Sequence, residues 1–139
     1  MVMGSKLEIG KVPVDLLNKL VLDPINNNIN KREDIVIRPS TGEDCSAVDP
    51  GGEICVLSTD PITAAGSNAG YLVVHINCND AASAGAEPIG ILLTILLPAG
   101  SSEEDLKEII DGAYKAAREL GIEILGGHTE VTEAVNKPV

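Results

Sequence analysis

The feature that most constrains the fold is the run of residues 89–97 (IGILLTILL), which is apolar apart from Gly90 and Thr94. Pro88 and Pro98 bound this run, and proline interrupts regular strand pairing because it lacks a backbone N–H. A strand that is apolar on both faces is normally covered on both faces. Helices of a small domain can cover one face, so the sequence predicts a second layer, such as another subunit, over the other.

Composition excludes some classes of partner. The formal net charge is −11, there is no Phe or Trp, and the only aromatic residues are Tyr71 and Tyr114. A phosphate backbone would be repelled and base stacking poorly supplied, so we expect no nucleic-acid partner. ATP remains compatible with an acidic chain when divalent cations lie between carboxylates and phosphates. No run approaches the roughly 18 apolar residues of a membrane span and no signal-peptide core is present. We therefore expect a soluble, cytoplasmic protein without a membrane partner.

The cysteines give no framework for the fold. Cys45, Cys55 and Cys78 are odd in number and lack CxxC spacing. Neither a disulfide scaffold nor a zinc site is indicated, and each cysteine is expected to be a small buried hydrophobic residue.

The N-terminal half predicts one helix and three short strands. Pro13 and an apolar stripe that includes Leu16 and Leu20 predict a short helix ended by Asp23-Pro24. Residues 26–32 are expected to form a loop. Strands are expected over 35–37, 46–48 and 54–58, with the turn 49–52 (DPGG) joining the last two as a hairpin.

The C-terminal half predicts two helices and two strands. After a small-residue loop over 64–70, residues 71–84 are interpreted as a helix, although Val73-Val74 would also suit a strand. Asn79 and Asp80 would lie near its apolar side, and Gly85 would end it. A capping box from Ser101 to Glu104 should begin a second amphipathic helix that ends at Gly121. A buried strand over 122–125 should follow and end at Gly126-Gly127.

Acidic and amide side chains follow several of these elements. They are Asp44, Asp60, the pair Asn79 and Asp80, and the pair His128 and Glu130 after Gly126-Gly127. Carboxylates gathered from several such positions would suit Mg²⁺, which prefers oxygen ligands and bridges to substrate phosphates. Glycines would let a backbone approach a phosphate closely.

Simpler interpretations stay open for each of these residues. Asp44 could form an Asx-turn and Asp60 could open a turn before Pro61. Asn79 and Asp80 could merely be solvated, although the helix dipole disfavours an anion at a C-terminal end. His128 is equally compatible with a loop histidine that has its hydrogen bonds satisfied. The chain has no Walker A motif, no GxGxxG and no GxSxG.

Four motifs, in order and with familiar spacing, resemble a known family. They are residues 42–48 (GEDCSAV), 58–60 (STD), 79–88 (NDAASAGAEP) and 126–131 (GGHTEV). They look like the N-terminal ATP-binding domain of the AIR synthase-related superfamily, which includes AIR synthase, thiamine-monophosphate kinase, selenophosphate synthetase and HypE. The opening residues 6–13 (KLEIGKVP) are similar to HypE-type hydrogenase maturation factors.

The resemblance implies an α+β fold. Its mixed or antiparallel sheet would have about four to five strands with helices on one face, and would pair with a second subunit into a β-barrel-like homodimer core. The resemblance also implies ATP and Mg²⁺ as cofactors. Metal ligands would be Asp44, Asp60, Asp80 and Glu130. Nucleotide contacts would come from Asn79, Gly126, Gly127, His128 and Thr129, although several family members have an acidic residue where this chain has His128.

The function implied is that of an ATP-dependent enzyme in which phosphorylation activates a carbonyl or carbamoyl oxygen, as in HypE-type hydrogenase maturation. Two alternatives remain: a phosphotransferase of the thiamine-monophosphate kinase type, and a dimerisation or regulatory module without catalysis. Residues 1–139 are expected to be the N-terminal domain alone, without the C-terminal domain of the family. Partners would then be that domain, a second copy and a hydrogenase maturation protein.

Overall fold

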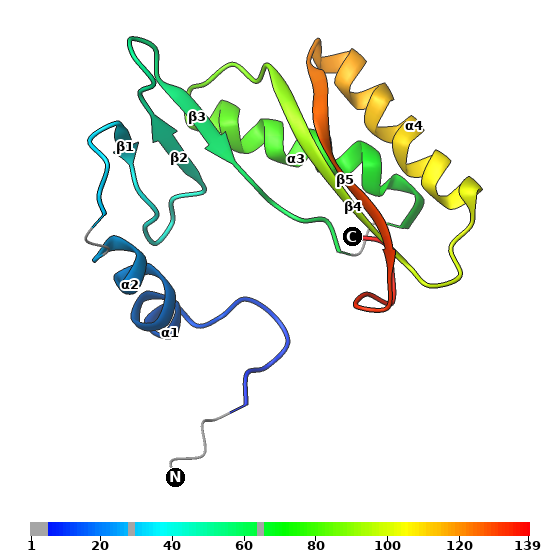
Figure 1. The fold of residues 1–139 in the computed structure, drawn as a ribbon, viewed down its shortest axis with the longest axis horizontal. Coiled ribbons are helices and arrows are strands. Elements are labelled where there is room, and N and C mark those ends of the chain that lie inside the picture. Colours follow the sequence, from blue (N-terminus) through cyan, green and yellow to red (C-terminus); the bar gives the residue numbers. More distant parts are fainter. Residues whose placement is uncertain (1–5, 28–29, 64–65) are drawn as a thin grey trace. The chain divides into compact units, whose positions relative to one another are not determined.

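A computed structural model describes residues 6–27, 30–63 and 66–139 (Figure 1). The chain divides into two compact parts, Met1–Leu57 and Ser58–Val139. The expected loops over 26–32 and 64–70 fall partly outside the described residues, at 28–29 and 64–65. Within the described ranges, no helix is long and apolar enough to cross a membrane.

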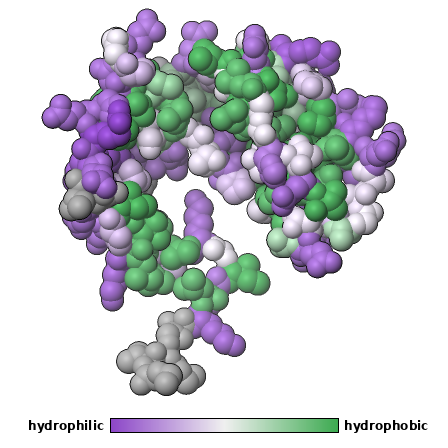
Figure 2. Space-filling model, viewed as in Figure 1, coloured by the Kyte–Doolittle hydropathy of each residue, from purple (hydrophilic) through white to green (hydrophobic). Residues whose placement is uncertain are grey.

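The first part begins with a helix that runs beyond its predicted end. It comprises α1 (Val14–Leu17), a π-helical turn (Asn18–Leu22) and α2 (Asp23–Asn26). The prediction that Asp23-Pro24 ends the helix is therefore wrong. Proline normally breaks a helix because an i→i−4 hydrogen bond is lost, but a π-helical turn has already departed from that pattern before Pro24. Apolar side chains gather on the surface of this helix (Figure 2).

Three short strands follow as one sheet in the order β1-β2-β3. Their bounds are Ile35–Ile37 for β1, Cys45–Val48 for β2 and Cys55–Ser58 for β3. β1 and β2 are antiparallel, and the Asp49 N–H donates to the Asp34 carbonyl at 2.8 Å where they end. The three strands predicted for this region are confirmed to within one residue at each end.

The turn between β2 and β3 is organised by Asp49. Its Oδ1 accepts hydrogen bonds from the backbone N–H groups of Gly51, at 2.9 Å, and Gly52, at 2.8 Å. Both glycines have positive φ angles near 130°, which residues with a Cβ rarely adopt. These two hydrogen bonds favour the carboxylate and hold the pKa of Asp49 below its ordinary value.

The second part begins with a 3₁₀ turn (Gly66–Asn68) that leads into helix α3 (Ala69–Ser83). The helix prediction is confirmed, but α3 starts two residues earlier than expected, at Ala69 rather than Tyr71. At its end Gly85 has φ 80°, its N–H donates to the Ala82 carbonyl, and the Ala86 N–H donates to the Ala81 carbonyl. This pair of bonds is a Schellman motif, so Gly85 ends the helix as predicted.

Helix α4 (Glu103–Leu120) has its capping box one residue later than the sequence suggested. Ser102, not Ser101, is the N-cap, and its Oγ accepts from the Asp105 N–H while Asp105 Oδ2 accepts from the Ser102 N–H at 2.7 Å. The shorter Asp side chain replaces the expected Glu104 at the third helical position. Gly121, with φ 70°, ends α4 as predicted.

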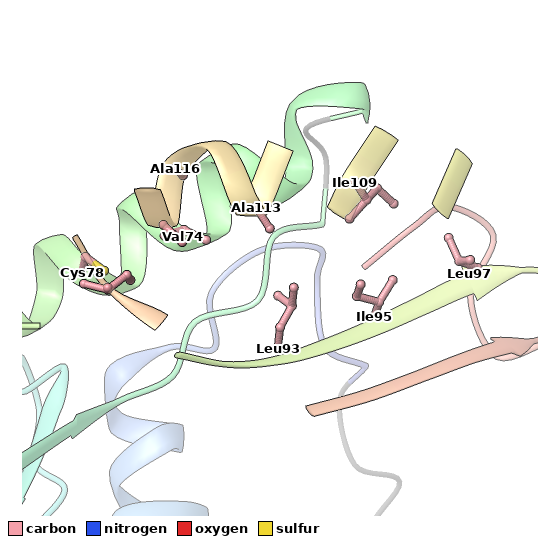
Figure 3. Close-up of a cluster of buried hydrophobic side chains, with 10 residues drawn as sticks. Val74, Cys78, Leu93, Ile95, Leu97, Ile109, Ala113 and Ala116 are labelled. Carbon is pink, nitrogen blue, oxygen red and sulfur yellow. The ribbon is translucent and has the colours of Figure 1, made fainter. Parts of the chain in front are cut away.

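Helices α3 and α4 cover one face of a parallel pair of strands, β4 (Gly90–Pro98) and β5 (Glu123–Thr132). Figure 3 shows alternate β4 side chains, Leu93, Ile95 and Leu97, pointing towards the two helices. Val74 and Cys78 of α3 and the alanines of α4 complete this core. The small side chains allow the helices to approach the sheet and each other closely.

The opposite face of β4 and β5 lacks a covering layer within the described residues of this chain. Leu92 is 73% exposed and Leu125 is 60% exposed. The second layer that the sequence predicts over this face stays a prediction. The strand expected over 122–125 is present as the start of β5, and Ile122 belongs to the core with Ile124 packed against it, but β5 continues to Thr132 and most of its side chains are exposed.

The fold is α+β, as predicted, but its strands form two sheets rather than one sheet of four to five strands. Both edges of β4 are occupied in the second sheet. β5 lies along one edge, and at the other edge Leu96 exchanges two backbone hydrogen bonds with Val139, at 2.8 and 3.0 Å. An exchange of both bonds is typical of an antiparallel pair, and here it involves Leu96 and Val139 alone among the described residues.

The cysteines divide between buried and exposed positions. Cys45 and Cys78 are buried, and burial raises the pKa of the Cys78 thiol, as predicted for a small hydrophobic residue. Cys55 is exposed in β3, so the same prediction is wrong there, because alternate residues of β3 face outward.

Candidate functional site

The segment that leaves β3 lies along helix α3 and brings two predicted site residues to one helical turn. Ser58 is the last residue of β3, and its Oγ donates to Asp80 Oδ2 at 3.3 Å. Two residues later, the backbone of Asp60 is hydrogen-bonded to the side chain of Asn77. Because Asn77 and Asp80 are three residues apart on α3, they lie on neighbouring positions of one face. The structure thus groups Asp60 with Asp80.

Asn77 is the residue at this site that the sequence-based analysis did not single out. Its Oδ1 accepts from the Asp60 N–H at 2.8 Å, and its Nδ2 donates to the Asp60 carbonyl at 3.1 Å and to the Val73 carbonyl at 2.9 Å. The available signal was an amide one turn before Asp80, on a helix that follows the strand exit at Asp60.

Asp80 is half-buried and Asp60 is exposed. Besides Ser58, the Asp80 residue contacts Ser83, whose Oγ donates to the Asp80 carbonyl at 2.8 Å. The Asp60 carboxylate faces solvent while its backbone is held. The Asp80 carboxylate is therefore oriented by the Ser58 hydroxyl. The position of the Asp60 carboxylate is set by its anchored backbone.

The predicted apolar surroundings of Asn79 and Asp80 are not what the structure shows. The buried positions of α3 include Val74 and Cys78, so Asn79 lies off the core-facing side of the helix. Asn79 is exposed as a result. An exposed amide beside a half-buried carboxylate is accessible to an approaching ligand.

Asp44 belongs to the first compact part of the chain. It precedes β2 directly and is exposed, in the turn where Glu43 Oε1 accepts from the Cys45 N–H at 3.4 Å. Asp60 and Asp80 belong to the second part.

Gly126 and Gly127 lie inside β5 rather than at its end, which corrects the predicted strand boundary. They pair with Leu92 and Leu93 of β4, just after a bulge at Leu125. An added Cβ at Gly127 would overlap the Leu93 carbonyl oxygen, and both glycines have φ near 145°. Close approach of β4 therefore explains Gly127 by packing alone.

The three residues that follow are exposed on β5. His128 Nε2 lies 3.0 Å from Glu130 Oε2, because residues two apart on a strand point to the same face. Thr129 points to the other face, beside Ile95 in the register. Glu130 is therefore paired with His128 within β5, whereas the sequence predicted that both residues follow the end of the strand.

The oxygen donors near Asp60 suit a magnesium ion. Mg²⁺ usually takes one or two protein carboxylates and completes its shell with water and substrate phosphates. Asp60, Asp80 and Ser58 supply oxygen ligands of that kind. Across 6–27, 30–63 and 66–139, no three His, Cys, Asp or Glu side chains cluster as a ready-made metal cage. The donor set fits a cation shared with a phosphate.

A concave surface elsewhere in the second part does not involve these residues. It has a volume of about 630 Å³ and lies between α4 and β5, where its lining includes Tyr114, Arg118, Ile122 and Ile124. None of the metal-binding or nucleotide-binding residues predicted from the sequence lines this surface. We place the candidate site at Ser58, Asp60, Asn77 and Asp80 because directed hydrogen bonds, rather than concavity alone, organise it.

Comparisons with known proteins agree on the family. Residues 42–139 match the family AIR synthase related protein, N-terminal domain. Carbamoyl dehydratase HypE of Cupriavidus necator is 38% identical over 89 residues, which cover 60% of this chain and 25% of the relative. The chain thus spans a minor share of that relative's length.

Solved structures show the same likeness. The structure of hydrogenase maturation protein HypE in complex with ATP matches with a TM-score of 0.53 and 26% identity, over 94% of this chain and 38% of that one. AaThiL complexed with AMPPCP and TMP matches in fold with a TM-score of 0.68 and 17% identity, over 91% of this chain and 41% of that one. The chain belongs to the AIR synthase related family and matches its N-terminal domain.

Proposed function

We propose that this chain is the Mg·ATP-binding part of an ATP-dependent enzyme of HypE type, which acts in hydrogenase maturation. The observation that carries the proposal is the attachment of the Ser58–Asp60 segment to one turn of α3, through Ser58 to Asp80 and Asn77 to Asp60. Similarity to a HypE structure in complex with ATP supports the choice of nucleotide.

In this proposal Asp60 and Asp80 hold the cation, and Asp44 remains a further candidate ligand. Mg²⁺, when bound, supplies positive charge that offsets the phosphate oxygens and the phosphoryl group as it transfers. Ser58 holds the Asp80 carboxylate in one orientation by donating to Oδ2. Asn79, exposed beside Asp80, donates its amide N–H to a phosphate oxygen.

The exposed strand residues have a second role in the proposal. His128 and Thr129 contact the nucleotide, with Gly126 and Gly127 beside them, while Glu130 either reaches the cation or keeps its bond with His128.

The exposed face of β4 and β5 carries Leu92 and Leu125, and we infer that the same face of a second copy covers it. A homodimer would bury these side chains.

For the complete enzyme we propose that the γ-phosphate moves to a carbamoyl oxygen of a substrate held largely outside this chain. Phosphorylation turns that oxygen into a better leaving group, and this is the chemistry that a dehydration requires. The residues of this chain bind and orient the donor end of the reaction. The rest of the substrate site would come from a C-terminal domain.

The experiment that tests the proposal is calorimetric titration of Mg·ATP into the 139-residue protein, with its solution mass measured by light scattering. We expect binding on a dimer, and loss of that binding in EDTA. A dimer that binds no Mg·ATP would favour the non-catalytic module. Phosphate transfer to thiamine monophosphate would favour the phosphotransferase alternative, and a monomer without binding would overturn the proposal.

A further inference from the structure

Asn77 uses its whole side-chain amide at the exit of β3. Its carbonyl oxygen accepts the Asp60 N–H, and its NH₂ group donates to two carbonyl oxygens, those of Asp60 and Val73. The bond to Val73 is within α3, four residues back, and fixes the direction in which the side chain points. The two bonds to Asp60 then fix the backbone on both sides of that residue.

Few side chains can make this set of contacts. Accepting one N–H while donating to two carbonyl oxygens requires an acceptor and two donor hydrogens on one group, which among side chains only the amides of Asn and Gln present. A serine or threonine hydroxyl would have one hydrogen to donate and a carboxylate would have none. An asparagine at position 77 is therefore suited to hydrogen-bond both backbone groups of Asp60.

The grip lies next to the second anchor of the same segment. Ser58 binds Asp80, one turn further along α3, so both ends of the short segment Ser58–Asp60 are tied to the turn from Asn77 to Asp80. The Asp60 backbone is anchored while its carboxylate stays exposed and outside the grip. The side chain that is left available is the one that the proposed function needs.

We propose that Asn77 is a positioning residue, which holds Asp60 so that its carboxylate and that of Asp80 bind one divalent cation together. This inference rests on the proposed function. Asn77 itself touches neither the cation nor the nucleotide. Its effect is to reduce the conformational freedom that the Asp60 segment would otherwise lose when the cation binds.

A purely structural role for Asn77 makes a different prediction. If the amide only ties a surface segment to α3, its loss would lower stability and leave the cation-dependent part of ATP binding unchanged. The test therefore compares Asn77→Ala with Tyr71→Phe. Tyr71→Phe also removes one side-chain hydrogen bond from α3, that between the Tyr71 hydroxyl and Glu119 at 2.8 Å, which lies away from Asp60.

Calorimetric titrations of ATP into wild type and both variants, in Mg²⁺ and in EDTA, give the decisive comparison, with hydrogen exchange of the Asp60 amide followed by NMR. In Asn77→Ala we expect faster exchange at Asp60 and a Kd for Mg·ATP raised by about tenfold, the size of one lost backbone anchor. Any binding that remains in EDTA should stay at the wild-type level, and Tyr71→Phe should behave as wild type.

Two results would overturn the inference while leaving the proposed function standing. One is wild-type affinity for Mg·ATP in Asn77→Ala despite faster exchange at Asp60. The other is an equal loss of affinity in Mg²⁺ and in EDTA. Failure of the proposed function is recognised separately, because wild type itself would then bind ATP no better in Mg²⁺ than in EDTA.

Discussion

Gly70 of α3 lies directly against the backbone of Ile109 in α4, so that a Cβ at position 70 would overlap the Ile109 carbonyl oxygen. Gly112 of α4 faces the same crossing, and a Cβ there would stand 3.0 Å from the Tyr71 nitrogen. The two helices therefore meet backbone to backbone. This close crossing fixes the position of α3 against α4, and α3 is the helix that carries Asn77 and Asp80.

Substitution of Gly70 should be strongly destabilising. In Gly70→Ala the new methyl group meets a backbone carbonyl that cannot move aside without shifting α4, and we expect a loss of about 3 kcal/mol in the free energy of unfolding. Urea denaturation followed by circular dichroism measures it. Gly112→Ala, with a less severe approach, should cost less; equal stability of Gly70→Ala and wild type would contradict the described crossing.

The capping box of α4 predicts a pH effect. Hydrogen bonds from the Ser102 backbone and side chain hold the pKa of Asp105 below its ordinary value. A lowered carboxyl pKa contributes stability above the unfolded-state pKa, and that stability is lost as pH falls through the folded-state pKa. Asp105→Asn should therefore lower Tm at neutral pH, and the difference from wild type should disappear in acid. Glu104→Gln is the matched control, and a larger effect there would favour the cap that starts at Ser101.

The acidic site predicts a selective loss in Asp80→Asn. The amide keeps the size of the side chain and can still accept from Ser58, so circular dichroism and Tm should stay near wild type. Mg²⁺-dependent ATP binding should fall below detection, because a neutral amide is a poor magnesium ligand. Asp111→Asn, which removes an exposed carboxylate on α4, is the control. Unchanged Mg·ATP affinity in Asp80→Asn would refute the assignment of the site.

The exposed face of β4 and β5 predicts the effect of a charge at Leu92. In the proposed homodimer this side chain is buried against a second copy, and an unpaired charge there would be costly. Leu92→Arg should therefore shift the mass measured by light scattering from dimer to monomer. Leu120→Arg places the same charge at another exposed leucine, on α4, and should leave the mass unchanged. If Leu92→Arg remained a dimer, the proposed interface on the exposed face of β4 and β5 would be wrong.

Local patterns predicted the elements better than their ends. The stripe of α4, the stop at Gly85 and the turn at Asp49 depend on neighbouring residues, and all three were confirmed. The cap of α4 was displaced by one residue because Ser101 and Ser102 both offer a hydroxyl, with an acidic residue three positions later in each case. The early start of α3 brings Gly70 into the helix, where it contacts the backbone of α4, and that contact is between residues far apart in the sequence.

Some residues of the candidate site could be named from the sequence, but their geometry could not. Asp60 and Asp80 were expected from their positions after a strand and near a helix end. Asn77 was missed, because its hydrogen bonds to the Asp60 backbone join residues 17 positions apart, and an amide one turn before Asp80 does not by itself indicate them. Gly126 and Gly127 looked like a strand end because glycine weakens strands, whereas the register with Leu92 and Leu93 carries β5 through them.

The parallel pairing of β4 with β5 has a consequence during synthesis on the ribosome. β4 emerges first and acquires its edge partners only after the whole of α4 and β5 have followed it. Until then its run of leucines and isoleucines is exposed, and such transiently unpaired apolar strands are prone to aggregate. We expect the nascent chain to be bound by chaperones over this interval, and release to follow only once the residues of β5 are available to pair.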